Sequence, residues 1–180
     1  MADNAALLDI LKSALPEAVL GSQERFGTLE VTVERAHWAA AVRALRDQAP
    51  ASFNMLVDLV SVDYSLFPNH GGHRFGLILH LKSLRLGHRL TLKCLLPEDE
   101  PQVASLTDLY ANANFLEREA FDQMGIRFSG HPNLKRLLNH HEFVGHPLRK
   151  DYPLKKRQTL SANESLMDEM DVRLREKGWV

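Results

Sequence analysis

The order of the predicted elements indicates an α+β fold within a single domain. A helix, a strand, a helix, three strands and further helices follow one another, which suits a mixed or antiparallel β-sheet with helices packed on a face. The length of 180 residues fits one such domain with an appendage. We expect residues 1–125 to form the α+β core. Residues 126–180 should form an extended partner-binding arm and a short C-terminal helix that do not fold independently.

The N-terminal part of the chain alternates between helix and strand. Residues 4–15 place four leucines on one helical face and end before Pro16, which predicts an amphipathic helix. Residues 28–34 alternate apolar and polar side chains, as a half-buried strand does. Residues 36–49 then predict a second helix, which Pro50 ends.

Three antiparallel strands are predicted in the middle of the chain. Residues 53–64 are apolar and β-branched enough for a central strand. Apolar side chains alternate again over residues 75–81 and 90–94. The connection over residues 65–73 is rich in turn residues, and the next one ends at Gly87. These features predict a three-stranded meander.

Two helices are predicted after the meander. An acidic loop over residues 97–101 leads to a short helix over residues 102–110, and a longer helix spans residues 114–124. Asn114 and Glu117 have the spacing of a capping box. The expected apolar face carries Leu116, Ala120, Phe121 and Met124, and the expected polar face carries Glu117, Arg118, Glu119 and Asp122.

Gly125 should adopt a left-handed conformation at the end of the helix. The segment that follows it is irregular. Residues 129–153 contain three prolines, two glycines and four histidines, with apolar residues scattered singly. So long an irregular stretch is functional or disordered, and its apolar content exceeds that of a solvated tail. We therefore expect an arm that lies along another subunit. Residues 161–164 form a capping box for a last helix, whose apolar stripe could pack on its own domain or on a neighbour.

Ordered blocks of sequence carry a resemblance to a known family. They are Glu117–Asp122, Gly125-Ile126, Gly130–Pro132, Leu134, Arg136–Leu138 and Gly145–Pro153, with residues 58–64, 90–97 and 105–110 upstream. In these blocks the chain resembles the C-type (30-kDa-type) subunit of NADH–quinone oxidoreductase, respiratory complex I, across residues 25–155. Phe115 stands where the family usually has tryptophan. Residues 139–142 also depart from the pattern, which leaves the local conformation of the arm open.

The resemblance implies a structural subunit that contains no cofactor and no catalytic residue. The assembly would transfer electrons from NADH, through iron–sulfur clusters in other subunits, to a quinone, and this transfer would be coupled to proton translocation. FMN, the clusters and the quinone would belong to partner subunits. The chain would lie in the peripheral arm, on the cytoplasmic side of the bacterial inner membrane. It would contact chiefly the D-type subunit, which helps to form the quinone cavity, and its iron–sulfur neighbours.

The expected partner-binding residues lie on the 114–124 helix and on the arm. They are Glu117, Arg118, Glu119, Asp122, His131, Pro132, Arg136, His146, Pro147, Leu148, Arg149, Lys150, Asp151, Tyr152 and Pro153. Glu117 and Glu119 lie about 200° apart around a helix, so they cannot act together as an acid and base pair. Charge pairing with a partner's arginines is the preferred interpretation of these carboxylates.

Composition excludes several other functions. Cys94 is the single cysteine, which excludes an internal disulfide and a cluster held by about four thiolates. The net charge of −1 provides no basic field for nucleic acid. No apolar run approaches the roughly 18 residues that cross a bilayer, and the N-terminus lacks a targeting pattern, so we expect a soluble cytosolic chain. Dinucleotide, phosphate-loop and G-x-S-x-G motifs are absent from the sequence.

Two alternative functions stay open. The closer one is the homologous subunit of a membrane-bound hydrogenase or a related complex. The more distant one is a metal-dependent hydrolase built on His131, His140, His141 and His146. A zincin places two histidines four residues apart on a helix, whereas His141 and His146 are five apart across Gly145. Hydrogen-bonded loop histidines are therefore the preferred interpretation.

Overall fold

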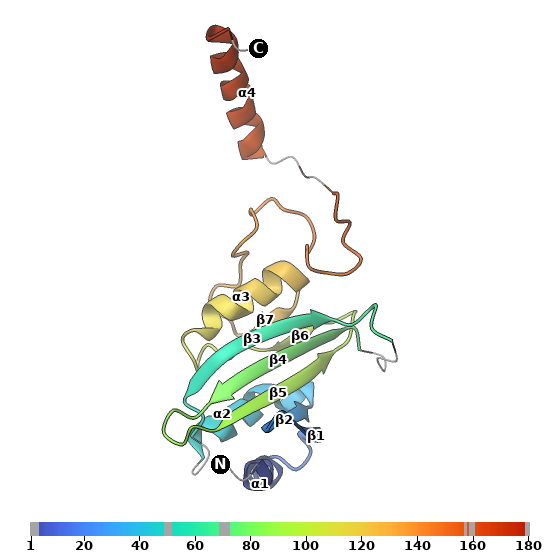
Figure 1. Ribbon diagram of the computed structural model, residues 1–180, viewed down its shortest axis with the longest axis vertical. Coiled ribbons are helices and arrows are strands. Elements are labelled where there is room, and N and C mark those ends of the chain that lie inside the picture. The colour runs from blue at the N-terminus through green and yellow to red at the C-terminus, as the bar shows by residue number, and fades with distance from the viewer. Residues whose placement is uncertain (1–3, 49–51, 69–72, 157, 159–160, 179–180) are drawn as a thin grey trace.

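The sheet determines where the other elements lie. The structure, a computed structural model, describes residues 4–48, 52–68, 73–156, 158 and 161–178. A five-stranded sheet of order β1-β2-β5-β4-β3 and a two-stranded pair, β6-β7, lie beside three helices, with a fourth helix beyond the arm (Figure 1). The predicted α+β fold is confirmed. The elements are α1 Asn4–Ala14, β1 Val19–Arg25, β2 Thr28–Val33, η1 Arg35–His37, α2 Trp38–Asp47, β3 Met55–Asp63, β4 Phe75–Lys82, β5 Arg89–Leu96, β6 Gln102–Ala104, α3 Ala113–Met124, β7 Arg127–Ser129 and α4 Ser161–Glu176.

The predicted meander is present, because β3 pairs with β4 and β4 with β5, both antiparallel. The sheet is nevertheless mixed, since β2 pairs with β5 in parallel. Strand β1, which pairs antiparallel with β2, was not predicted. Its sequence, VLGSQER, has no apolar alternation because almost all of its residues are exposed at the sheet edge.

Strand β3 lies at an edge of the sheet, so its predicted central position is wrong. The segment before α3, rather than another strand, contacts the start of β3 and Phe53 just before it. The Tyr110 hydroxyl donates to the carbonyl of Phe53 at 2.6 Å, and the Asn112 amide donates to the carbonyl of Leu56 at 2.9 Å. An apolar strand sequence does not show whether a neighbouring strand or an irregular segment shields the strand from solvent.

One face of the sheet carries the core. The predicted alternation in β2 is confirmed, because Leu29, Val31 and Val33 are all buried. Helices α1 and α2 cover this face with side chains that are almost fully buried: Leu7, Leu11, Trp38, Val42 and Leu45. The described residues of α2 end at Asp47, and the predicted stop at Pro50 lies outside the described part of the chain.

The segment between β5 and α3 does not form the predicted short helix. Residues 102–104 form β6, which pairs in parallel with β7, and turns follow up to Tyr110. Val103 is the buried residue of β6. Three residues are too few for a periodic signal, so the pairing with β7 could not be recognised from the sequence.

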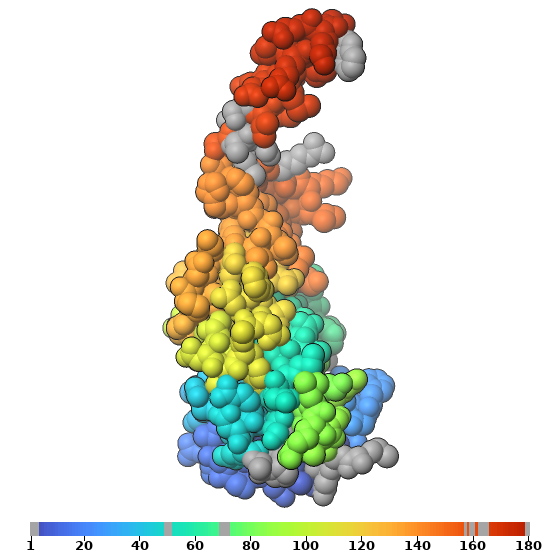
Figure 2. Space-filling view, turned by 90° about the vertical axis from the view of Figure 1, so that its left-hand side faces the viewer, coloured from blue at the N-terminus to red at the C-terminus, as the bar shows by residue number. Residues whose placement is uncertain are grey.

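The last helix is exposed. Helix α4 begins at Ser161, and Gly178 follows its end with a φ of +68°, a left-handed conformation typical of a helix stop. The amide and hydroxyl of Ser161 donate to the Glu142 carboxylate of the arm, and the capping partner predicted at residue 164 lies outside the described side chains. Met167 and Met170 are more than half exposed. Figures 1 and 2 show α4 beyond the arm, away from the sheet.

Candidate partner-binding surface

Glu117 is buried within α3, so its predicted place on an exposed, partner-facing side of the helix is wrong. Its carboxylate accepts hydrogen bonds from the amide of Leu106 and the hydroxyl of Ser105, both at 2.6 Å. Burial raises the pKa of Glu117, although these two hydrogen bonds act in the opposite direction. Asn114 lies inside α3, Asn112 occupies the N-cap position, and the expected capping box is not formed. Glu117 therefore joins α3 to the preceding turn.

Asp122 is also buried, and it holds the arm against α3. One carboxylate oxygen accepts the backbone amides of Leu137, Leu138 and Asn139 at 2.8–3.1 Å. The other accepts the Arg136 guanidinium at 2.7 Å and the Asn139 side chain at 3.1 Å. Burial acts to raise the pKa of Asp122, but the amide of Asn139 and the Arg136 guanidinium outweigh it and hold the value at about 2. The predicted surface carboxylate is thus an internal anchor.

Two arginines extend this anchoring along the arm. Arg118 donates to the carbonyls of Lys135 and Arg136 at 3.0 and 2.9 Å. Arg136, already bound to Asp122, also donates to the carbonyl of Gly145 at 3.0 Å. Both were expected to meet a partner, and both instead satisfy carbonyl groups of the irregular arm, which has no secondary structure to pair them.

A second ion cluster joins the arm to the β3–β4 hairpin. The Asp63 side chain is completely buried, and Arg74 binds it at 3.0 Å. Arg74 also binds Glu98 at 2.5 Å and Asp151 at 2.7 Å. The backbone amide of Lys150 donates to Asp63 at 2.9 Å. Burial acts to raise the pKa of Asp63, but Arg74 and the amide of Lys150 lower it well below its usual range.

Gly125 allows a third contact between arm and helix. Its φ of +76° is the predicted left-handed conformation, and a Cβ there would lie 2.5 Å from Arg149 and 2.6 Å from His146. Arg149 donates to the carbonyl of Met124 at 2.7 Å, and its guanidinium lies 4.9 Å from the centre of the Phe75 ring. Nδ1 of His146 is 3.0 Å from the carbonyl of Asp122. Burial, with the nearby guanidinium charges, lowers the pKa of His146, so the ring is neutral at pH 7.

The remaining predicted partner residues divide into held and exposed groups. His131 contacts the carbonyl of Asn114, and Tyr152 stacks on Phe143 and accepts the Gln158 amide at 2.7 Å. Pro147 is half-buried beside these contacts. Exposed on the surface are Glu119, Pro132, Leu148, Lys150, Asp151 and Pro153.

Four large aliphatic side chains of the arm are exposed, and of these only Leu148 is among the partner-binding residues predicted from the sequence. Leu138, Val144, Leu148 and Leu154 are exposed by 65%, 67%, 55% and 99%. Four large aliphatic side chains on one irregular segment are more than a solvated loop needs, and such clusters mark interaction sites. Hydrogen bonds hold the backbone at Leu138, Val144 and Leu148, and we call the four side chains together the outer arm surface.

A polar cleft of about 620 Å³ lies beside the arm, between the acidic loop and α3. Its lining carries charges of both signs: Glu98, Asp99, Glu100, Arg127, Arg136 and Arg149. Within the described residues, His, Cys, Asp and Glu nowhere group in threes that could hold a metal ion. No helix in the described part of the chain is long and apolar enough to cross a membrane.

Comparison with known sequences identifies the family of this chain. Residues 31–158 match the family described as the 30 kDa subunit of respiratory-chain NADH dehydrogenase. The chain belongs to this family. The match includes every predicted partner-binding residue and the whole outer arm surface, and ends before α4. The resemblance drawn from the sequence blocks is therefore confirmed.

Relatives of the 30 kDa family align over most of this chain. The C-type subunit of the NADH-quinone oxidoreductase from Thiobacillus denitrificans is 43% identical over 80% of this chain and 74% of its own length. The same subunit from Roseiflexus sp. is 45% identical over 84% of this chain and 85% of its own length.

Solved structures share the fold. A trypsin-resistant fragment of Nqo5 is 32% identical, with a TM-score of 0.59, covering 71% of this chain and 98% of the fragment. A chain of the membrane-bound sulfane sulfur reductase, an archaeal respiratory membrane complex, has a TM-score of 0.70 over 86% of this chain and 88% of its own length. Because it is only 21% identical, this second likeness indicates a common fold alone.

Proposed function

We propose that this chain is a structural subunit of an NADH–quinone oxidoreductase, held in the peripheral arm of the complex by its outer arm surface. The observation that carries the proposal is the clamped arm. Backbone amides and carbonyls of the arm are hydrogen-bonded to side chains of the domain and of the arm itself, namely Asp122, Arg118, Arg136 and Asp63. Four large apolar side chains of the arm are exposed to solvent. A preordered apolar surface loses little conformational entropy on docking, which favours a permanent interface.

The chemistry of electron transfer is assigned to other subunits. Cys94 is fully buried, and burial raises the pKa of its thiol to about 12, so it remains a protonated core residue. The carboxylates that could act as acid or base, Glu117 and Asp122, are engaged by internal donors. On this proposal FMN, the iron–sulfur clusters and the quinone belong to partner subunits, chiefly the quinone-cavity subunit and its neighbours. The complex would expose this chain on the cytoplasmic side of the membrane and translocate protons.

The test is a pair of substitutions on the outer arm surface. Leu148→Asp and Leu154→Asp each place a charge where we expect a desolvated apolar contact. We expect the melting temperature of the free chain to change little, because both side chains are more than half exposed. Incorporation into the membrane complex and NADH–quinone activity should fall in parallel. Leu84→Asp, in the turn after β4 and 59% exposed, is the matched control and should assemble normally.

Three results would count against this proposal. Normal assembly of both arm variants would mean that the outer arm surface faces solvent. Normal assembly with lost turnover would give the chain a catalytic part. Membranes that oxidise another donor but not NADH, with the chain incorporated, would favour the alternative of a related respiratory or hydrogenase complex.

A further inference from the structure

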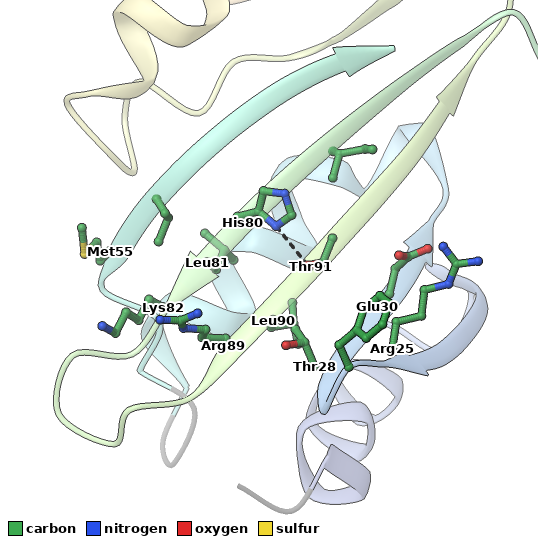
Figure 3. A pocket seen from close by; sticks show the side chains of 13 residues that line it. Arg25, Thr28, Glu30, Met55, His80, Leu81, Lys82, Arg89, Leu90 and Thr91 are labelled. Atoms are coloured by element: carbon green, nitrogen blue, oxygen red, sulfur yellow. Dashed lines mark hydrogen bonds between the residues drawn. The ribbon is translucent and has the colours of Figure 1, made fainter. Parts of the chain in front are cut away.

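The face of the sheet opposite α1 and α2 is uncovered. Figure 3 views this face, which forms a hollow of about 620 Å³ across β2, β5, β4 and the start of β3. The apolar side chains exposed on this face are Phe26, Met55 and Val57, with Ile78 partly exposed, whereas Leu81 and Leu90 border the hollow but bury their side chains in the core. Met55 and Val57 are 40% and 48% exposed. An antiparallel sheet can present one face to water, but such a face normally carries polar side chains.

Cations lie on both sides of this hollow. Lys82 and Arg89 come from the facing ends of β4 and β5, and Arg25 comes from the end of β1 (Figure 3). Glu30 is the one carboxylate among the lining residues, and the Gln23 amide already donates to it at 2.7 Å. The lining therefore carries three basic residues against one acidic residue, which favours an occupant with carboxylates on two sides.

The hairpin beside the hollow is strained. Phe26 and Gly27 form the two-residue turn between β1 and β2, and both have positive φ, +51° and +74°. This is a type I′ turn, which prefers asparagine, aspartate or glycine at both positions. Phe26 is instead an aromatic residue in a left-handed conformation, and its side chain is fully exposed. Phe26 therefore lowers the stability of the free chain twice, through its strained backbone and through its exposed ring. Such a residue is expected where its side chain makes a contact with a partner.

We propose that the hollow is the docking site of an amphipathic helix from another subunit, with an apolar stripe bordered by carboxylates and with Phe26 as the aromatic anchor. The inference rests on the proposed function, because it needs an assembly. A lipid tail fits less well, since the floor carries the hydrogen-bonded pair His80 and Thr91, at 3.0 Å. Helix α4 of the same chain lies beyond the arm at the opposite end of the molecule (Figure 1).

The first experiment compares the free chain with the complex purified from membranes. If a helix covers Met55, the rate of its oxidation by hydroxyl radicals should be about tenfold lower in the complex than in the free chain. A tenfold reduction is what a side chain that is covered most of the time would show. Carbodiimide should join the Lys82 amine to a glutamate or aspartate of another subunit, and mass spectrometry identifies that residue. Lys12, an exposed cation on α1, is the control for unselective cross-linking.

The second experiment separates docking from folding with Phe26→Asn. Asparagine suits the turn, so the free chain should melt at the same temperature or higher. Against co-expressed unchanged chain, incorporation should fall about 30-fold, which corresponds to the ~2 kcal/mol of an interface anchor. Arg89→Glu should reduce incorporation in the same assay. Leu66→Asn, which replaces another exposed apolar side chain in the turn after β3, should leave it unchanged.

The outcomes are distinguishable. If the chain is present in the complex but Met55 stays fully reactive and Phe26→Asn assembles normally, the hollow is a solvated face and the inference is wrong. A cross-link from Lys82 to residues 161–178 of a second copy would overturn it by naming a different occupant. If the chain never copurifies with the complex, the proposed function fails and this inference with it. Protection of Met55 with a Lys82 cross-link to an acidic helix supports it.

Discussion

Replacing Asp122 by asparagine tests whether one carboxylate organises the arm. The substitution keeps the shape of the side chain but removes its charge and turns one oxygen into an amide donor. Five donors converge on this group, namely three backbone amides, Arg136 and the Asn139 side chain. An asparagine amide group can face only part of this set without placing donor against donor. The arm must therefore lose either its backbone anchor or its ion pair.

The size of the effect follows from the ionisation of Asp122. Its pKa is lowered from 3.8 to about 2, which corresponds to about 2.4 kcal/mol of stability at neutral pH. Because the folded-state pKa is the lower one, this stability is present above pH 4 and is lost as the pH falls toward 2. We expect Asp122→Asn to lower the free energy holding the arm by roughly 2–4 kcal/mol.

Hydrogen exchange measured peptide by peptide checks this prediction. Amides of Leu137, Leu138 and Asn139 should exchange much faster in the variant, while those of β4 in the core should change little. Glu119→Gln, one turn away and exposed, is the control and should leave the arm unchanged. Unaltered exchange at residues 137–139, or equal acceleration in β4, would refute the assignment of Asp122 as the local anchor of the arm.

Three further substitutions test the internal contacts, each by thermal or denaturant unfolding. Gly125→Ala should cost more than about 2 kcal/mol, because alanine is strained at φ +76° and its Cβ would displace Arg149; a smaller loss would contradict that crowding. Arg74→Met should cost roughly 3–5 kcal/mol, since Asp63 stays buried without its cation, and full stability in the variant would argue against the ion cluster. Glu117→Gln should change stability by less than about 1 kcal/mol, because the amide oxygen can still accept from the Leu106 amide and the side-chain NH2 can donate to the Ser105 hydroxyl, whereas Glu117→Ala should cost about 1–3 kcal/mol by leaving the Leu106 amide unpaired.

Residue patterns within one short stretch of sequence correctly predicted several helices and strands. Alternation identified β2, β4 and β5, and leucine spacing identified α1. Gly125 correctly marked the end of α3. Each of these signals comes from one face meeting the core, or from one backbone conformation that glycine adopts cheaply.

The failures concern groups whose environment is made by distant segments. In a projection of α3 alone Asp122 occupies the polar side, whereas Glu117 falls among Ala120, Phe121 and Met124 on the apolar side, where only its charge suggested exposure; both are buried. The turn before α3 covers one carboxylate and the arm covers the other. Helical periodicity identifies the face of a helix that packs on the core. It carries no information on a second face that becomes buried when a later segment of the chain folds back over the helix. For the same reason, the inward roles of Arg118, Arg136 and Arg149 could not be separated from roles at a partner.

The contact between Lys150 and Asp63 links residues 87 positions apart in the chain. Contacts of such sequence separation close a long loop and form late, after local and neighbouring strands have paired. During synthesis the hairpin that contains Asp63 and Arg74 leaves the ribosome well before the arm does. The sheet can therefore be assembled while the arm is still being made, and the arrival of Lys150 and Asp151 completes the ion cluster. The arm thus takes its final shape last, after the fold that supports it.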